Sequence, residues 1–232
     1  MLRGVTPLRQ YQLALALLVS AACVHRPALR PAPDTLAHAE AGRAALLERA
    51  PRTFRYVHQV VARYGPTSFV MTGYLVARAS GNFLVSGMAP FGPKLFEVSK
   101  VSGRWQAKAY AAELAERMDV TNVGRAVERI YLVRANGPLS WDGAAWTARD
   151  AISSDPEVDA VETFRAPATL AITRQRYFHA GRAVLDIHYQ KLEQISGEWI
   201  ARYVRLEDAR GFSLELSVSD YKPDIEVGTD VL

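Results

Sequence analysis

The stretch from Thr72 to Gly92, TGYLVARASGNFLVSGMAPFG, places two runs of apolar and β-branched residues on either side of Ser80-Gly81-Asn82. Runs of this kind, bounded by Gly, Asn and Ser, are typical of strands joined by a tight turn. A second turn signal, Pro90-Phe91-Gly92-Pro93, ends the stretch. It therefore predicts two neighbouring antiparallel strands, because connections this short leave no room for a crossover helix.

The same pattern of apolar and β-branched runs separated by turn residues extends on both sides of this hairpin. From Phe54 to Tyr110, further turn signals at 64–67 and 101–104 divide the chain into about five strands with short connections. Strand-like runs return towards the C-terminus, at 169–178, 183–193, 198–207 and 211–219. Residues 135–163 predict only a hairpin around Trp141-Asp142-Gly143 and then a solvated loop, whose acidic residues are Asp155, Glu157, Asp159 and Glu162.

Two segments have helical periodicity. Asp34 is a suitable N-cap for an amphipathic helix that Pro51 ends at about Ala50. Within 111–133, apolar residues recur at helical spacing, and these are Val120, Val123, Val127, Ile130 and Tyr131. Strands, then helices, then strands in one chain predict a single α+β domain, residues 34–232, built on a large antiparallel sheet.

Composition and charge exclude several classes of function. The chain has 232 residues, of which 49% are hydrophobic and 22% charged, and this balance is typical of a globular protein. The net charge of +4 is dispersed along the chain rather than gathered in basic blocks, so we expect no nucleic-acid partner.

Residue patterns for catalysis are also missing from the sequence. The five histidines lack metal-ligand spacing, and there is a single cysteine. For His58 and His188, which fall in predicted strands, a polar face or a hydrogen-bonded core position is favoured over an ion pair with Asp186 or Glu97. The sequence has neither a nucleophile elbow nor a phosphate-binding glycine loop. We therefore expect no enzymatic activity, no metal and no cofactor.

Residues 1–22 have the layout of a secretory signal peptide. Arg3 and Arg9 precede an apolar run at 13–19 that is too short to span a bilayer, and small residues then lead into Cys23. Cleavage before Cys23 with lipidation is favoured over cleavage that leaves a free thiol, because an exported unpaired thiol is reactive. Residues 23–33, with prolines at 27, 31 and 33, then form an extended tether between lipid and domain.

The strands predicted at 69–76 and 83–85 are apolar at successive positions. A sheet with one solvated face should instead alternate between apolar and polar residues. Two explanations are open at this point: helices and loops cover both faces, or one face lines an apolar cavity.

Three local patterns resemble the LolA/LolB-like family of periplasmic lipoproteins, in particular its outer-membrane receptor branch, LolB. Residues 72–92 are similar to the family's strand, turn, strand and tip, with Phe91 in place of the usual leucine, and the strand at 94–98 follows directly. Residues 120–132 fall where the family carries its lid helix. Residues 206–221 resemble its last hairpin.

The resemblance implies a half-open antiparallel β-barrel with a helical lid over an apolar cavity. It implies an outer-membrane lipoprotein, anchored through Cys23 on the periplasmic face, that takes acyl chains of lipoproteins or lipids from a periplasmic carrier protein and transfers them to the membrane. Phe91 is then a contact for membrane or cargo. The residues expected to line the cavity are Val70, Tyr74, Leu75, Leu84, Phe96 and Val127. The alternative is a non-carrier, structural lipoprotein of an envelope assembly, with a solid core.

We predict that Cys23→Ala releases the protein from the membrane into the soluble periplasmic fraction. The reason is that several acyl chains on one cysteine, at about 0.8 kcal/mol per buried CH₂, hold a domain at a bilayer almost permanently. Cell fractionation and intact-mass analysis check this outcome. A variant that stays membrane-bound, together with a wild-type protein that carries no acyl groups, contradicts the lipoprotein prediction.

Overall fold

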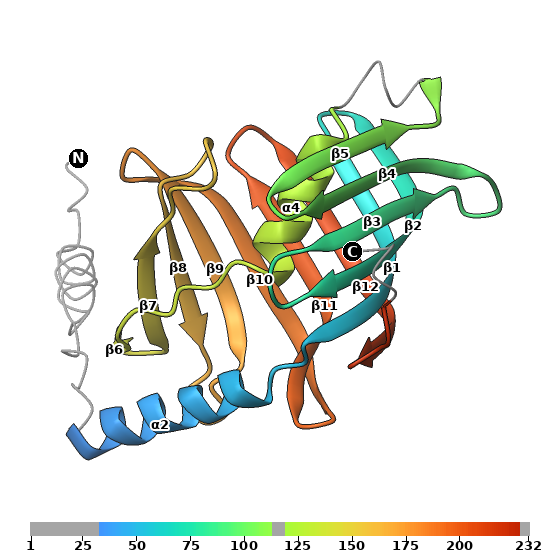
Figure 1. Cartoon of the computed structure of the whole chain (residues 1–232). Helices are drawn as coiled ribbons and strands as arrows, with labels where there is room; N and C mark the ends of the chain where they lie inside the picture. Colours follow the sequence, from blue (N-terminus) through green and yellow to red (C-terminus); the bar gives the residue numbers. More distant parts are fainter. Residues whose placement is uncertain (1–32, 113–118, 228–232) are drawn as a thin grey trace, which may run out of the picture.

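The computed structural model describes residues 33–112 and 119–227, and this part of the chain forms one curved, twelve-stranded antiparallel sheet with two helices (Figure 1). The segment predicted to be a signal peptide, Cys23 and nearly all of the predicted tether lie outside the described residues. Neither of the two helices described there is long and apolar enough to cross a membrane.

The sheet consists of two meanders joined along one seam. Its strand order is β5-β4-β3-β2-β1-β12-β11-β10-β9-β8-β7-β6, so the first and last strands of the chain pair at the centre. The strands are β1 (Thr53–Tyr64), β2 (Thr67–Arg78), β3 (Phe83–Met88), β4 (Lys94–Val101), β5 (Arg104–Ala109), β6 (Ser140–Trp141), β7 (Trp146–Ala151), β8 (Ala160–Arg165), β9 (Ile172–His179), β10 (Arg182–Ile195), β11 (Glu198–Asp208) and β12 (Phe212–Pro223).

Most of the predicted strands are confirmed. Five hairpin-connected strands occupy 53–109, the four closing strands follow from 172 to 223, and β6 pairs with β7 around the predicted turn. The acidic loop is shorter than predicted, because Glu162 lies inside β8 rather than in a loop. This carboxylate is compatible with a strand because its cross-strand partner in β9 is the oppositely charged Arg176.

Strand β2 alternates strictly between the two faces of the sheet. Met71, Leu75 and Ala77 are buried on the concave face, whereas Val70 and Tyr74 on the other face are exposed. The expectation that both apolar faces are covered, or that Val70 and Tyr74 line a cavity, is wrong. The exposed side is the convex outer surface of the barrel, where a few solvated apolar residues are tolerated.

The helices occupy the open end and the interior of the curved sheet. The helix α2 (Pro33–Arg49) precedes β1, and α4 (Thr121–Tyr131) lies between the two halves of the sheet (Figure 1). On one side α4 packs so closely on β4 and β5 that a Cβ atom on Gly124 would come within 2.5 Å of the Trp105 ring and 2.7 Å of Val98. Glycine at this helix position therefore permits close contact between helix and sheet.

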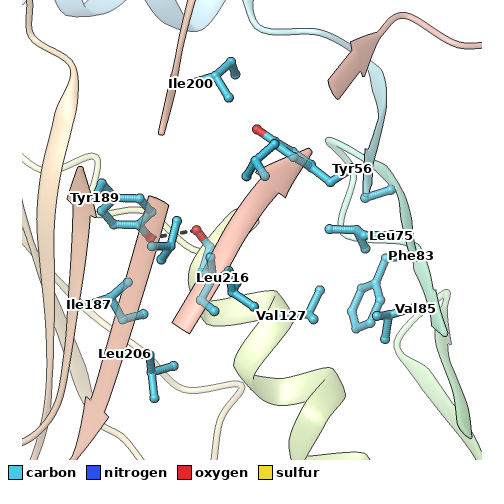
Figure 2. Packing of buried hydrophobic residues seen from close by; sticks show 14 of the residues in the cluster. Tyr56, Leu75, Phe83, Val85, Val127, Ile187, Tyr189, Ile200, Leu206 and Leu216 are labelled. Carbon is cyan, nitrogen blue, oxygen red and sulfur yellow. Dashed lines mark hydrogen bonds between the residues drawn. The ribbon is translucent and has the colours of Figure 1, made fainter. Parts of the chain in front are cut away.

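The core forms around this inner helix. In Figure 2 the side chain of Val127, from α4, lies between Phe83 and Val85 on one side and Ile187 and Leu206 on the other. These residues are all buried. The helix that resembles a lid thus fills one part of the barrel with packed side chains and leaves space elsewhere.

Candidate functional site

A cavity of about 480 Å³ lies beyond the C-terminal end of α4, between that end, the last turn of α2 and the concave face of the sheet. Its volume falls within the range of roughly 300–1,000 Å³ that is common for sites of small organic ligands. Strands β1 and β8 to β12 form the wall on the sheet side. The leucine, isoleucine, valine and phenylalanine side chains of the lining are Leu46, Leu47, Phe54, Leu132, Val133, Leu170, Ile172, Leu192, Ile200 and Val204.

An aromatic cluster closes one side of the cavity. Tyr56 of β1 and Tyr221 of β12 are cross-strand partners, and their ring centroids are 4.7 Å apart. Tyr131, the last residue of α4, lies at the same centroid distance from Tyr56. Tyr56 is shown with Tyr189 and Ile200, two further lining residues, in Figure 2. The end of the helix is thus fixed against the seam of the sheet by ring contacts.

Two tyrosine hydroxyls of the second meander form hydrogen bonds with the end of α4. Tyr177 of β9 donates to the carbonyl of Arg129, and Tyr189 of β10 donates to the carbonyl of Ile130, both at 2.7 Å. These carbonyls belong to the last turn of the helix, where no further helical amide is present to pair with them. Burial raises the pKa of Tyr189 to about 12 and that of Tyr177 well above its usual value, so both hydroxyls keep their protons at neutral pH.

His58 is a core residue that packs against the same aromatic cluster. Its side chain is buried, and Nε2 is 2.7 Å from the hydroxyl of Tyr131. Burial lowers the pKa of His58 to about 4, and a hydrogen bond with the Gly73 backbone opposes this shift only in part. The prediction of a hydrogen-bonded core histidine is confirmed for His58. His188, in contrast, lies on the outer face, 3.3 Å from Asp186.

Charged groups also lie on the cavity lining. Arg165, the last residue of β8, is buried and donates from Nη1 to the carbonyl of Leu170 at 3.0 Å. Arg134 follows α4 and donates to the carbonyls of Tyr131 and Val133. Glu198 of β11 is the carboxylate of the lining, and burial together with nearby Asp224 raises its pKa.

The six residues expected to line a cavity do not line this one. Leu75, Phe96 and Val127 are buried in the packed core, Leu84 is half-buried, and Val70 and Tyr74 are exposed. The physical reason is that α4 fills the half of the barrel in front of β2 to β4. The sequence analysis missed the lining residues of the closing strands, among them Tyr189, Leu192, Ile200 and Val204. Ile200 and Val204 have the even spacing of one strand face, whereas Lys191, with a positive φ, interrupts the alternation between Tyr189 and Leu192.

The tip between β3 and β4 is exposed, as the turn residues predict. Phe91 is fully exposed. The amide of Gly92 bonds to the carbonyl of Ala89 at 3.3 Å, and the amide of Ala89 bonds to the carbonyl of Pro93 at 3.2 Å. A short, proline-flanked turn therefore presents an aromatic ring to solvent, far along the chain from the residues of the cavity.

The acidic segment before β8 is a structural contact rather than a solvated face. Arg129 of α4 is buried and donates from Nε to Asp155 at 2.7 Å and from Nη2 to Glu157 at 2.9 Å. The expectation that Asp155 and Glu157 are simply solvated is wrong, because a guanidinium buried at the helix surface requires negative partners. Among the described residues, no group of three or more acidic, histidine or cysteine side chains is placed to hold a metal ion.

The open antiparallel sheet with a helix in its concavity is the LolA-like fold, a half-open barrel whose edges do not join. The chain is similar to the crystal structure of a LolA superfamily protein from Nitrosomonas europaea, with a TM-score of 0.57 and 14% identity over 83% of this chain and 96% of that one. It is also similar to a DUF1329 family protein from Desulfovibrio piger, with a TM-score of 0.52 and 12% identity over 84% and 95% of the two chains. No protein-family model and no curated protein matches the sequence. At these identities the similarity shows the fold alone.

We predict that the buried His58 makes the protein less stable as the pH falls from about 6.5 to about 4. In this window the unfolded chain binds a proton at His58 and the folded protein does not, so the free energy of unfolding decreases. The decrease from this residue is roughly 3 kcal/mol in total, and the stability is fully present above pH 6.5. Urea unfolding at a series of pH values measures it.

The variant His58→Gln isolates this contribution, because glutamine accepts the Tyr131 hydrogen bond but does not titrate. We expect a flatter pH dependence of the free energy of unfolding for His58→Gln than for the wild type. A His58→Gln protein with the full wild-type slope contradicts the prediction.

Proposed function

We propose that this protein is an envelope lipoprotein that binds the acyl chains of lipoproteins or lipids and delivers them to the outer membrane, as a LolB-like receptor. The observation that carries the proposal is the cavity of about 480 Å³ inside a LolA-like fold, lined mostly by aliphatic and aromatic residues, with many polar atoms on its surface as well. Burial of an acyl chain on such a wall supplies affinity at about 25 cal/mol per Å² of apolar surface removed from water. The proposed activity is binding and transfer, with no covalent chemistry, metal or cofactor.

The proposed location is the periplasmic face of the outer membrane. The support for it is the sequence before the described residues, where an apolar run leads through small residues to Cys23. Val24 follows this cysteine, and it is not the acidic residue associated with retention at the inner membrane. A soluble periplasmic carrier protein is the proposed donor of the acyl cargo.

The exposed Phe91 is proposed as the contact with the membrane or with incoming cargo. A fully exposed aromatic ring on a turn buries no surface within its own fold. At the headgroup region of a bilayer, such a ring gains apolar contacts without rearrangement of the barrel. Delivery then combines a cavity at the end of α4 with a separate point of contact on the β3–β4 turn.

A second function has its own support in the structure. The tight contact of α4 at Gly124 and the buried residues Leu75, Phe96 and Val127 make one half of the barrel a solid core. A structural lipoprotein of an envelope assembly needs only such a core and no ligand. The two functions differ in whether the space beyond α4 takes up lipid.

We predict that organic extraction of the purified protein, followed by mass spectrometry, recovers lipid, and that filling the cavity reduces the amount. Ala201 is half-buried on the lining, so Ala201→Phe inserts a ring into the space. We expect at least a severalfold loss of bound lipid in Ala201→Phe. Ala151→Phe, at an exposed position outside the lining, serves as the matched control and retains wild-type lipid content.

The competing function gives a different result. Repeated absence of bound or exchangeable lipid from the wild type, with both variants indistinguishable from it, removes the carrier proposal and favours the structural lipoprotein. The free energy of unfolding of each variant is measured alongside, so that a loss of lipid is not confused with a loss of fold.

We predict that Phe91→Glu weakens association with liposomes and delivery of acyl cargo while it changes the free energy of unfolding by less than about 0.5 kcal/mol, as is usual for surface positions. Liposome flotation and denaturant unfolding measure the two quantities. A stability loss of several kcal/mol with unchanged liposome binding assigns Phe91 to the barrel rim instead. Val101→Glu, at an exposed apolar position in another turn region, is the matched control.

A further inference from the structure

Two arginines on the cavity lining have no acidic partner in the described part of the chain. Arg165 ends β8, and Arg134 follows α4. Other arginines with little exposed surface do form ion pairs, such as that of Arg129 with Asp155. Arg134 and Arg165 form no ion pair in the described part of the chain, and Arg134 also lies over the ring of Tyr189, 5.9 Å from its centroid.

Arg165 is the more isolated of the two. Its side chain is 5% exposed, Nη1 alone donates a hydrogen bond, to the Leu170 carbonyl, and Nε is buried without a partner. The nearby acid Glu40 is engaged elsewhere, because it accepts from Arg43 at 2.9 Å and from the Leu139 amide at 2.6 Å. A buried cation without a counterion is unfavourable in free energy unless another group supplies the missing charge.

Arg134 is held in place by neutral oxygens. Its guanidinium donates to the carbonyls of Val133 at 2.7 Å and Tyr131 at 3.0 Å, and to Oε1 of Gln175 at 3.2 Å. The first two carbonyls extend the negative end of α4, which orients the cation but carries only a fraction of a charge. Burial and the positive charges of Arg134 and Arg43 lower the pKa of Arg165 to about 10, which leaves it a cation at neutral pH.

We propose that the cavity selects amphiphiles with an anionic head, a carboxylate or a phosphate, held by Arg165 and Arg134, while the acyl chain lies against the apolar wall. This proposal rests on the proposed function and specifies its ligand. The guanidinium fork matches the oxygens of both head groups. Glu198, the carboxylate of the lining, forms no ion pair with Arg165 or Arg134 in the described part of the chain, and its own pKa is raised by burial and by nearby Asp224.

The test compares three ligands that share one chain length. Dodecanoate, dodecyl phosphate and dodecanol are titrated by calorimetry, at about pH 8, into delipidated full chain carrying Cys23→Ala. We expect the two anions to bind at least about tenfold more tightly than the neutral alcohol, because a charge-assisted hydrogen bond contributes that much. The order of dodecanoate and dodecyl phosphate tells a fatty acid from a phospholipid as the natural source. Inorganic phosphate that binds as tightly as dodecyl phosphate overturns the proposal in favour of a free-anion site.

Substitution of single arginines shows which residue is responsible for the preference for anionic ligands. Arg165→Met is expected to lower the affinity for both anions to about that of dodecanol and to leave dodecanol binding within about threefold of the wild type. Arg104→Met removes one positive charge from an exposed position of β5 outside the lining, and it is expected to keep the full preference. A wild-type preference that persists in Arg165→Met overturns the assignment of this residue.

The wild-type comparison stands even if Arg165→Met does not fold. Equal binding of dodecanol and the two anions by the wild type overturns the anion proposal while the carrier function survives. Failure of all three ligands to bind defeats the carrier function itself. Thermal unfolding of Arg165→Met in the absence of ligand adds a further check, since removal of an unpaired buried charge is expected to leave the melting temperature unchanged or raised. A large decrease instead assigns Arg165 a structural role at the Leu170 carbonyl.

Discussion

The capture of α4 between the two halves of the sheet is the contact on which the rest of this structure depends. Tyrosine hydroxyls of β9 and β10 pair with the carbonyls at the end of the helix, and its opposite side packs on β4 and β5 through the glycine at 124. Helix ends buried without such partners are unfavourable, so these hydrogen bonds fix where the helix stops. The position of that stop divides the interior of the barrel into a packed part and an open part.

The two parts have different chemistry. The packed part around Val127 is apolar and includes the buried rings of Phe83 and Phe96, whereas the open part combines aliphatic walls with tyrosine hydroxyls, two arginines and a glutamate. A cavity with both kinds of group suits a ligand that is itself divided into an apolar chain and a polar end. The buried histidine under the aromatic cluster remains uncharged at neutral pH and contributes to the fold rather than to the lining.

Much of the fold could be predicted from the sequence, because short turns and strand-like runs are local signals. The hairpin at 72–92, the closing strands and the helix around Val127 were all recoverable in this way. The cavity lining was not, because it depends on how far a helix of eleven residues extends into a barrel, and no local pattern encodes that distance. The acidic residues before β8 were misjudged for the same reason, since their partner, Arg129, is distant in sequence. Glu162 was misplaced because a charged residue on the wet face of a strand looks like a loop residue.

The unjoined edges of the sheet, β5 and β6, have a consequence for the size of the interior. In a closed barrel, strand number and register fix the circumference. In the part of the chain that the structure describes, the two meanders are joined by backbone pairing along the seam of β1 and β12 alone, so strand pairing does not fix the separation of their far ends. The seam carries a register shift between Val57 and His58, at the level of the aromatic cluster. Because α4 contacts one meander through Gly124 and the other through Tyr177 and Tyr189, this helix, and not a closed ring of strands, sets the distance between the two halves and therefore the size of the interior.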